Sequence, residues 1–372
     1  MVAIHQPKQA EISQKSPPVT AGVDIGAGLS KLCVGGGSQQ MRLRLPSKMV
    51  EIKEELHDIL TSKEGGHFFY HEGDRQDLIE REFLTGTLAA WKAPTTHIKL
   101  SDDPALKVEY ALQCIIGALA ALPQRLEWNL HLVLSIHNSK VFGTQLKDKV
   151  KGTHVVSFNG INTPTSRVNL KVSLVAPEGA GSYGFAVSTK PEALIDRTTH
   201  AIAFDFGTST VIPTVFAPGG SIIHRKVLEV GGCIDLLDAI AGDTELIQFL
   251  GKGKAGSVEV VRQGIEDSSF KYGTRHFDFR PLYARHLKPW LADRLRLAFK
   301  EVSEWRDAAG SLVAWGGGVE MPGVSKMLGS QGIIAVLSRM RYRADGFKAE
   351  GRRQRAEVKC TPLNRETLYC CA

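Results

Sequence analysis

Length, composition and charge exclude several classes of protein. The chain has 372 residues, 43% of them hydrophobic and 23% charged, which is typical of a folded globular protein with room for two domains of roughly 150 residues. No apolar run reaches the roughly 18 residues of a membrane span, and the N-terminus lacks a signal-peptide segment. We therefore expect a cytoplasmic protein with no membrane partner. A net charge of +7 spread over a large surface does not by itself indicate direct DNA binding.

The first half of the chain predicts a meander of strands and then a helical region. Residues 1–19 are polar, and we expect a flexible tail there. Asp103 and Pro104 are a typical helix start, and the apolar period after them predicts one long buried helix that Pro123 ends. The other expected elements are strands at 21–26, 31–34, 41–45, 130–136, 155–158 and 168–175, and a short basic helix at 140–150.

A second unit is expected to begin near residue 198, because its opening repeats that of the first. An apolar strand again ends in Asp-x-Gly, here at Asp205 and Gly207. Two copies of one domain plan are the natural interpretation, with domains at 20–197 and 198–345, a basic tail at 346–372, and a last helix that could return to the first domain. Further elements are expected as strands at 211–216 and 311–315 and helices from 234, at 282–305 and at 324–338.

Four glycine-rich segments carry the candidate chemistry. In the first, Asp24 ends a strand and could hold a hydrated Mg²⁺, and Lys31 could neutralise phosphate charge. Its turn residues Gly26, Ala27 and Gly28 would let backbone N–H groups approach phosphate oxygens closely. A plain hairpin turn explains this segment alone equally well.

The second segment places another strand-end carboxylate, Asp205, before a glycine and three hydroxyl residues. Hydroxyls and amides in such a turn can bind phosphates from the opposite side. The residues concerned are Gly207, Thr208, Ser209 and Thr210. Alone, this too is only a turn.

The third and fourth segments are the glycines at 231–232 and 316–318. Gly231 and Gly232 precede an expected helix, whose N-terminus is a possible anion site or simply a helix start. Gly316, Gly317 and Gly318 follow an apolar strand and would let a flat adenine ring lie against bare backbone. The order and spacing of the four segments make them more informative together than singly.

These segments resemble the phosphate-1, phosphate-2 and adenosine loops of the superfamily of actin, sugar kinases and heat-shock chaperones, in the same order. Within it, the chain resembles the plasmid-segregating actin-like ATPases of bacteria, the ParM/StbA group, over roughly residues 20–350. Supporting stretches are 151–155 (KGTHV), 175–183 (VAPEGAGSY) and 228–232 (LEVGG). The resemblance implies an α/β actin-like fold, in which two related α/β domains flank a nucleotide cleft.

The resemblance also implies roles for individual residues. Glu178 matches the glutamate that helps to position the attacking water, with a surface-loop glutamate as the alternative. Asp24 and Asp205 would organise Mg²⁺ and its waters, Lys31 would contact phosphate, and the glycines of 316–318 would form the adenosine pocket. One departure is Pro213, which follows Ile212 where the family often has a second aspartate; a proline there suits only an edge strand or a bulge.

The function implied is an ATPase that polymerises into filaments with ATP and loses them after hydrolysis. ATP is the expected nucleotide, with GTP not excluded. Such filaments segregate plasmid DNA through an adaptor protein bound to a centromere-like DNA site. A small-molecule kinase and a non-hydrolysing cytoskeletal scaffold remain alternatives, because fold does not choose among them. The basic residues from Arg339 to Arg355 could contact DNA or a neighbouring subunit, or form a solvated face.

Overall fold

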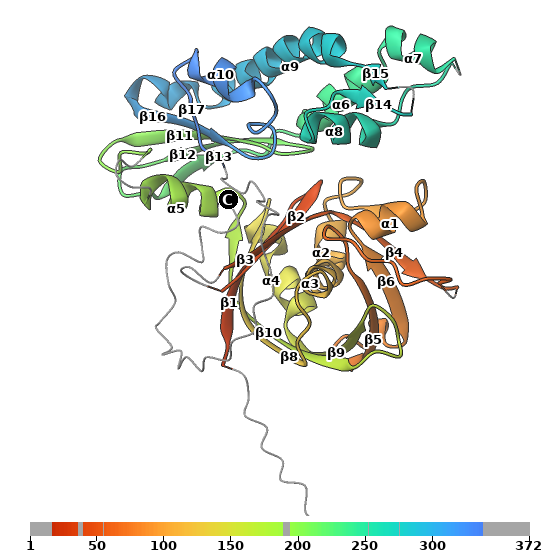
Figure 1. The fold of residues 1–372 in the computed structure, drawn as a ribbon. Coiled ribbons are helices and arrows are strands. Elements are labelled where there is room, and N and C mark those ends of the chain that lie inside the picture. The colour runs from red at the N-terminus through yellow and green to blue at the C-terminus, as the bar shows by residue number, and fades with distance from the viewer. Residues whose placement is uncertain are drawn as a thin grey trace, which may run out of the picture.

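Two β-sheets organise the chain in the computed structural model (Figure 1). The structure describes residues 17–35, 40–54, 56–188, 194–251, 253–274 and 276–337, so the expected tail at 346–372 and the basic cluster from Arg339 lie outside it. One sheet has ten strands and the other has five, and each has its own hydrophobic core. None of the helices in the described ranges is long and apolar enough to cross a bilayer.

The ten-stranded sheet is built around the strand expected at 130–136. This strand, β8, lies between β1 and β10 and runs parallel to both. Apolar side chains on one face of these strands pack against the helices, which the curved sheet surrounds in Figure 1. In sheet order the strands are β3 (Met41–Pro46), β2 (Leu29–Val34), β1 (Val19–Ile25), β8 (Glu127–Ile136), β10 (Thr165–Pro177), β9 (Gly152–Phe158), β5 (His67–Gly73), β6 (Arg81–Thr85), β4 (Lys48–Ile52) and β7 (Ile98–Lys99).

The long helix expected after Pro104 is two helices. The chain leaves the helical conformation at Tyr110, where φ is −104° and ψ is 12°, and then resumes it. The second piece is buried along its whole length and on every side. The helices of this unit are α1 (Thr87–Lys92), α2 (Leu106–Glu109), α3 (Ala111–Ala120) and α4 (Ser139–Val150), with a 3₁₀ turn η1 (Gln76–Leu78).

The five-stranded sheet repeats the opening of the first, with a hairpin followed by a parallel neighbour. Its order is β13 (Ile222–Arg225), β12 (Val211–Phe216), β11 (His200–Phe206), β16 (Ala309–Trp315) and β17 (Ile334–Ala335). In Figure 1, α9 (Arg280–Glu301) and α10 (Val324–Gly329) cover one face of this sheet, and α5 (Ala180–Ser188) lies on the other. The remaining elements are α6 (Cys233–Ala241), α7 (Thr244–Leu250), α8 (Val258–Glu266), the small pair β14 (Lys271–Tyr272) and β15 (Phe277–Asp278), α9 (Arg280–Glu301), a 3₁₀ turn η2 (Ser303–Ala308) and α10 (Val324–Gly329).

Two expected helices end earlier than their apolar patterns suggested. α9 stops at Glu301, and Trp305 lies in η2. The helix expected at 324–338 is wrong beyond Gly329, because Gly332 has a positive φ of 74° and turns the chain into β17, which pairs with β16. After that turn Ile333 and Val336, on either side of β17, are buried, whereas Ile334 is exposed.

Pro213 lies inside the second sheet, on a strand that is not at the edge. β12 pairs with both β11 and β13, but β13 ends at Arg225, just before the position opposite Pro213. The Pro213 carbonyl accepts a bond from the amide of Lys226, 3.1 Å away. The N–H and C=O groups of a residue in an antiparallel strand point to the same neighbouring strand. At Pro213 that side is the one where β13 has already ended, so the missing N–H costs no hydrogen bond to β11.

The helix α5 (Ala180–Ser188) packs on the second sheet although it precedes residue 198. Ala186 shares a core cluster with Phe216 and Trp315, and the Tyr183 ring stacks on Phe216 with centroids 4.0 Å apart. The domain boundary expected at residues 197 and 198 remains a prediction. By packing, the chain passes to the second unit directly after β10.

Candidate functional site

The two Asp-x-Gly hairpins occupy equivalent places in their sheets and touch each other. Asp24 pairs across its hairpin with Lys31 and beside the parallel strand with Ser135, while Asp205 pairs with Ile212 and with Trp315 in the same way. The turns meet directly, because a Cβ atom at Gly28 would overlap the side chain of Thr208. The structure therefore brings the two expected phosphate loops together.

Asp24 is held by partners that the strand register supplies. Its carboxylate lies 3.3 Å from Lys31 Nζ and accepts a hydrogen bond from Ser135 Oγ at 2.7 Å. Burial by itself would lower the Lys31 pKa, but the carboxylates of Asp24 and Asp205 outweigh it and the pKa is raised. Lys31 is therefore a fixed positive charge beside the first turn.

The first turn is braced by a serine that the sequence analysis missed. Ser47, between β3 and β4, donates from Oγ to the Gly26 carbonyl at 2.6 Å and from its amide to the Gly28 carbonyl at 2.9 Å. These bonds occupy carbonyl groups on both sides of Ala27 and leave the amides of the turn for a ligand. Nothing in the local sequence at Ser47 signals this role.

The Asp205 carboxylate differs from that of Asp24 in its surroundings. In the part of the chain that the structure describes, nothing donates a hydrogen bond to its carboxylate. Burial and the nearby carboxylates of Glu178 and Asp24 together raise the pKa of Asp205 to about 7, against the opposing charges of Lys31 and Arg225. A cation placed here would relieve this excess of negative charge.

The second phosphate turn is tied to the start of α6. The amide of Gly207 bonds to Thr210, and the amides of Cys233 and Ile234 donate to the carbonyls of Gly207 and Thr208, both at 3.0 Å. A Cβ at Gly232 would overlap the Gly207 carbonyl oxygen, so only glycine permits this approach.

The first two amides of α6 are thus used within the protein. The carbonyls before them are also occupied, since Trp290 Nε1 donates to Gly232 at 2.9 Å and Arg294 Nε donates to Gly231 at 2.8 Å. Gly231 and Gly232 therefore shape the second turn. Their direct contact with phosphate stays a prediction, as do the roles of Ser209 and Thr210.

The three glycines after β16 have different surroundings. Gly316 has φ +94°, and a Cβ there would lie 2.6 Å from Asp205 Oδ1. Gly318 donates its amide to the Phe206 carbonyl at 3.0 Å, and a Cβ would meet Cys233 Sγ at 2.8 Å. A Cβ at Gly317 would meet nothing within 4 Å, so this position faces open space. The turn thus packs against Asp205 on one side and leaves bare backbone on the other.

Glu178 lies where the first unit passes to the second, directly after β10. Its amide donates to the Ile136 carbonyl at 3.0 Å, and its Oε1 accepts from Lys107 Nζ at 2.9 Å. Arg225, on β13 of the second sheet, donates to the backbone carbonyls of His137 at 2.7 Å and of Glu178 at 3.5 Å. Neither Lys107 nor Arg225 stands in a motif that marks it as part of this site.

The same environment keeps His137 neutral. Burial, with the nearby charges of Lys107 and Arg225, lowers the pKa of His137 to about 4. Its buried Nδ1 has no hydrogen-bond partner in the described chain, and the same holds for Nε of Arg225. Near Glu178, therefore, the positive charges of Lys107 and Arg225 lie beside the two aspartates. Two buried nitrogens there have no hydrogen-bond partner in the described chain.

The donor set suits a hydrated magnesium ion bound together with phosphates. No cluster of three or more His, Cys, Asp or Glu side chains that could cage a metal occurs within the described ranges. Mg²⁺ keeps several waters and needs only one or two carboxylates when a phosphate supplies the other ligands. Asp24 and Asp205 on facing turns, with Asp205 uncompensated, fit that pattern.

Comparisons with known proteins agree with this arrangement. Residues 22–181 match the family described as the N-terminal domain of actin-like proteins. No curated protein sequence matches the chain.

Solved structures match most of the chain. An archaeal actin homologue is 14% identical with a TM-score of 0.63, and covers 86% of this chain and 94% of its own. ParM of Bacillus thuringiensis with ATP is 15% identical with a TM-score of 0.58, covering 86% and 93%. The chain of a 15-stranded ParM filament from Clostridium botulinum is 15% identical with a TM-score of 0.58, and the match covers 85% of this chain and 91% of that one. Residues 22–181 therefore match the N-terminal domain of actin-like proteins, and the chain has the fold shared by ParM and the archaeal actin homologue.

Proposed function

We propose that this protein binds ATP with Mg²⁺ between its two units, hydrolyses the ATP, and assembles with copies of itself into filaments whose disassembly follows hydrolysis. The observation that carries the proposal is the contact between the two Asp-x-Gly turns with Glu178 beside them. Asp24, Asp205 and Glu178 are far apart in the sequence, and a phosphate-binding cleft is the simplest reason to bring three carboxylates together despite their repulsion.

Each part of the site has a task in that reaction. The amides of Gly26–Gly28 and of the second turn would bind phosphate oxygens, and Lys31 would offset their charge. Bound Mg²⁺ would neutralise charge on the phosphates. Glu178 would accept a hydrogen bond from the attacking water and hold it in line with the γ-phosphate. The open backbone at Gly317 would take the adenine ring.

Filament formation is proposed from the solved structures that share this fold, and not from the geometry of the cleft. Among the structures of this fold, one is a ParM filament and another is ParM with ATP. We extend to this chain their self-association, and with it a role in segregating plasmid DNA through an adaptor protein on a centromere-like site. Direct DNA contact is not part of the proposal.

The test follows assembly and hydrolysis in one sample. Light scattering and pelleting, recorded beside phosphate release, should show ATP- and Mg²⁺-dependent polymer that decays as phosphate appears. Glu178→Gln should bind ATP and assemble, but release phosphate about 10²–10⁴ times more slowly, because it loses one positioned base. The exposed Glu72→Gln serves as the matched control and should behave like the wild type.

Other outcomes would identify the alternatives. A scaffold would assemble without releasing phosphate, and Glu178→Gln would change nothing. A small-molecule kinase would form no ATP-dependent polymer in either form. Phosphate release by Glu178→Gln at the wild-type rate would remove the catalytic assignment even where filaments form.

A further inference from the structure

Lys107 is a buried lysine that makes its ion pair with Glu178. Its side chain is only 9% exposed and that of Glu178 is 14% exposed, and Nζ lies 2.9 Å from Oε1. Lysine is almost never buried unless it is paired, because removing an ammonium group from water is costly. Lys107 and Glu178 are 71 residues apart, so this contact exists only in the folded chain.

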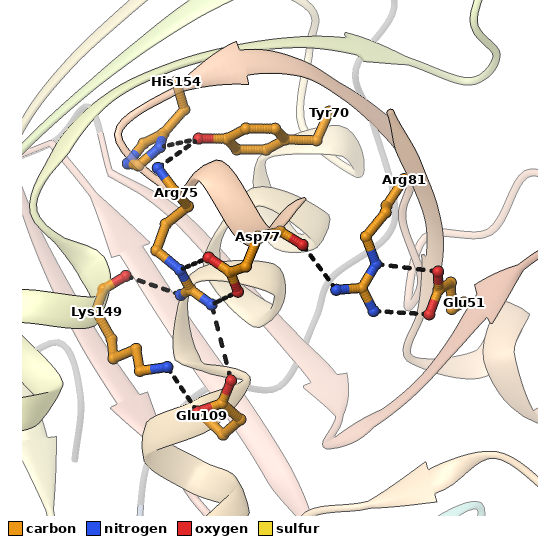
Figure 2. Close-up of polar contacts among 8 residues, drawn as sticks. All are labelled: Glu51, Tyr70, Arg75, Asp77, Arg81, Glu109, Lys149 and His154. Carbon is orange, nitrogen blue, oxygen red and sulfur yellow. Dashed lines mark hydrogen bonds and ion pairs between the residues drawn. The ribbon is translucent and has the colours of Figure 1, made fainter. Parts of the chain in front are cut away.

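The helix that carries Lys107 is anchored on its other side. Two residues further along α2, Glu109 accepts a hydrogen bond from Lys149 Nζ at 2.7 Å and lies 3.8 Å from Arg75 (Figure 2). Arg75 is itself fixed by a bidentate interaction with the Asp77 carboxylate and by a hydrogen bond that it donates to the Lys149 carbonyl. The helix that carries Lys107 is therefore anchored by contacts of the first unit that lie outside the cleft.

The two oxygens of Glu178 are in different situations. Oε1 is bonded to Lys107, whereas Oε2 has no hydrogen-bond partner within the part of the chain that the structure describes. The backbone of Glu178 is fixed independently, by its amide bond to Ile136 and by Arg225. With backbone and one oxygen fixed, the direction of the second oxygen is set as well.

We propose that Lys107 is a positioning residue that holds Glu178 through Oε1 and so presents Oε2 to the attacking water. This inference rests on the proposed function of Glu178. Lys107 also supplies the positive charge that lets a carboxylate stay beside Asp205 and Asp24, which would otherwise repel it. Without Lys107 the Glu178 side chain turns away from the other carboxylates, and the water loses its orientation.

The test separates positioning from folding by measuring binding and turnover apart. Lys107→Met keeps the length of the side chain and removes its charge. We expect single-turnover hydrolysis to fall by about 10-fold or more while the Kd for ATP changes less than about twofold, since the phosphate and adenosine contacts remain. Lys107→Arg restores the charge and should recover part of the rate. Lys151→Met, which removes an exposed ion pair with Asp148, is the matched control.

A double-mutant cycle gives the decisive readout. If Lys107 acts through Glu178, Lys107→Met should cost little further rate in a Glu178→Gln background. A wild-type rate in Lys107→Met, or equal rate losses in both backgrounds, overturns the inference. Wild-type phosphate release by Glu178→Gln overturns the proposed function instead, and the inference with it. Should Lys107→Met fail to fold, Lys107→Gln and Lys107→Arg carry the same cycle.

Discussion

Two polar clusters of this molecule differ in whether their charged and buried polar groups have partners. In the cluster around Arg75, shown in Figure 2, the charged groups are paired, Arg75 with Asp77 and Glu109 with Lys149, and the buried neutral hydroxyl of Tyr70 bonds to His154 Nδ1 at 2.8 Å. In the cleft cluster of Asp205, Glu178, Arg225 and His137, Asp205 has no hydrogen-bonding partner in the described chain, and buried nitrogens of Arg225 and His137 have none there either.

The difference distinguishes polar groups that stabilise the fold from polar groups that are available to a ligand. A polar cluster whose buried groups all have partners needs no ligand, whereas unsatisfied groups in a low-dielectric site raise the free energy of the folded protein until a ligand satisfies them. The first cluster anchors α2, and through Lys107 it fixes one member of the second. The cluster around Arg75 thus helps to fix the position of Glu178 in the cleft cluster.

The two aspartates give the largest predicted contrast. Asp24→Asn leaves Lys31 buried without its ion pair and should lower the free energy of unfolding by about 3 kcal/mol without nucleotide. Asp205→Asn removes an uncompensated charge and should leave that free energy unchanged or raise it. Urea unfolding of the two variants checks this, and equal losses would contradict the difference between the turns. Both variants should bind ATP with Mg²⁺ less tightly.

The glycines after β16 separate folding from binding. Gly316→Ala forces a side chain onto a backbone with φ +94° and against Asp205, so we expect a loss of about 1–3 kcal/mol in stability, seen as a lower Tm. Gly317→Ala has free space and should keep the wild-type Tm while weakening ATP binding, because its methyl group occupies the face offered to the ring. Unchanged ATP affinity in Gly317→Ala, measured by calorimetry, would place the adenosine elsewhere.

Tyr70→Phe tests the satisfied cluster. Removing the hydroxyl leaves buried His154 Nδ1 and the Arg75 amide without their partner. The expected loss is about 1–2 kcal/mol in the free energy of unfolding, with ATP affinity unchanged, since neither group faces the cleft cluster. Phe69→Leu, on the same strand, is a control for general loosening of β5. A change in ATP affinity without a change in stability would mean that this cluster is not structural.

The smallest predicted effect concerns an ion pair between the two units. Lys48 on β4 lies 2.6 Å from Glu259 on α8. Burial would raise the Glu259 pKa, but bonds and charges from Arg262 and Lys48 outweigh it and lower the pKa to about 2, from an ordinary 4.5. A lowered carboxyl pKa stabilises the fold above the ordinary value, and this stabilisation is lost as the pH falls from about 4.5 towards 2.

Glu259→Gln should therefore flatten part of the acid side of the Tm profile. We expect a difference below about 1 kcal/mol, since both side chains are partly exposed. Lys48→Met should reproduce only part of it, because Arg262 remains. Parallel profiles of wild type and Glu259→Gln over this range would show that the ion pair contributes nothing measurable.

Local patterns predicted the central strands of both sheets and the two Asp-x-Gly turns, but not β4, β5, β6, β7, β13 or β17. Alternating or continuous apolar runs closed by Asp-x-Gly located β1 and β11, and the contact between Gly28 and Thr208 confirms that these turns meet. Helix ends were predicted less well. The break at Tyr110 and the early stop at Gly329 come from packing and from backbone conformation, to which an apolar period is insensitive.

The sequence by itself determined the central strands of both sheets and where glycine turns follow an aspartate, because both depend on neighbouring residues along the chain. Only the tertiary structure decided which charges are paired. Ser47, Lys107 and Arg225 carry no local signal, and each reaches its partner across 21 to 88 residues. Whether a carboxylate is compensated, as Asp24 is, or exposed to the repulsion of its neighbours, as Asp205 is, depends on the charges and burial that folding gathers around it.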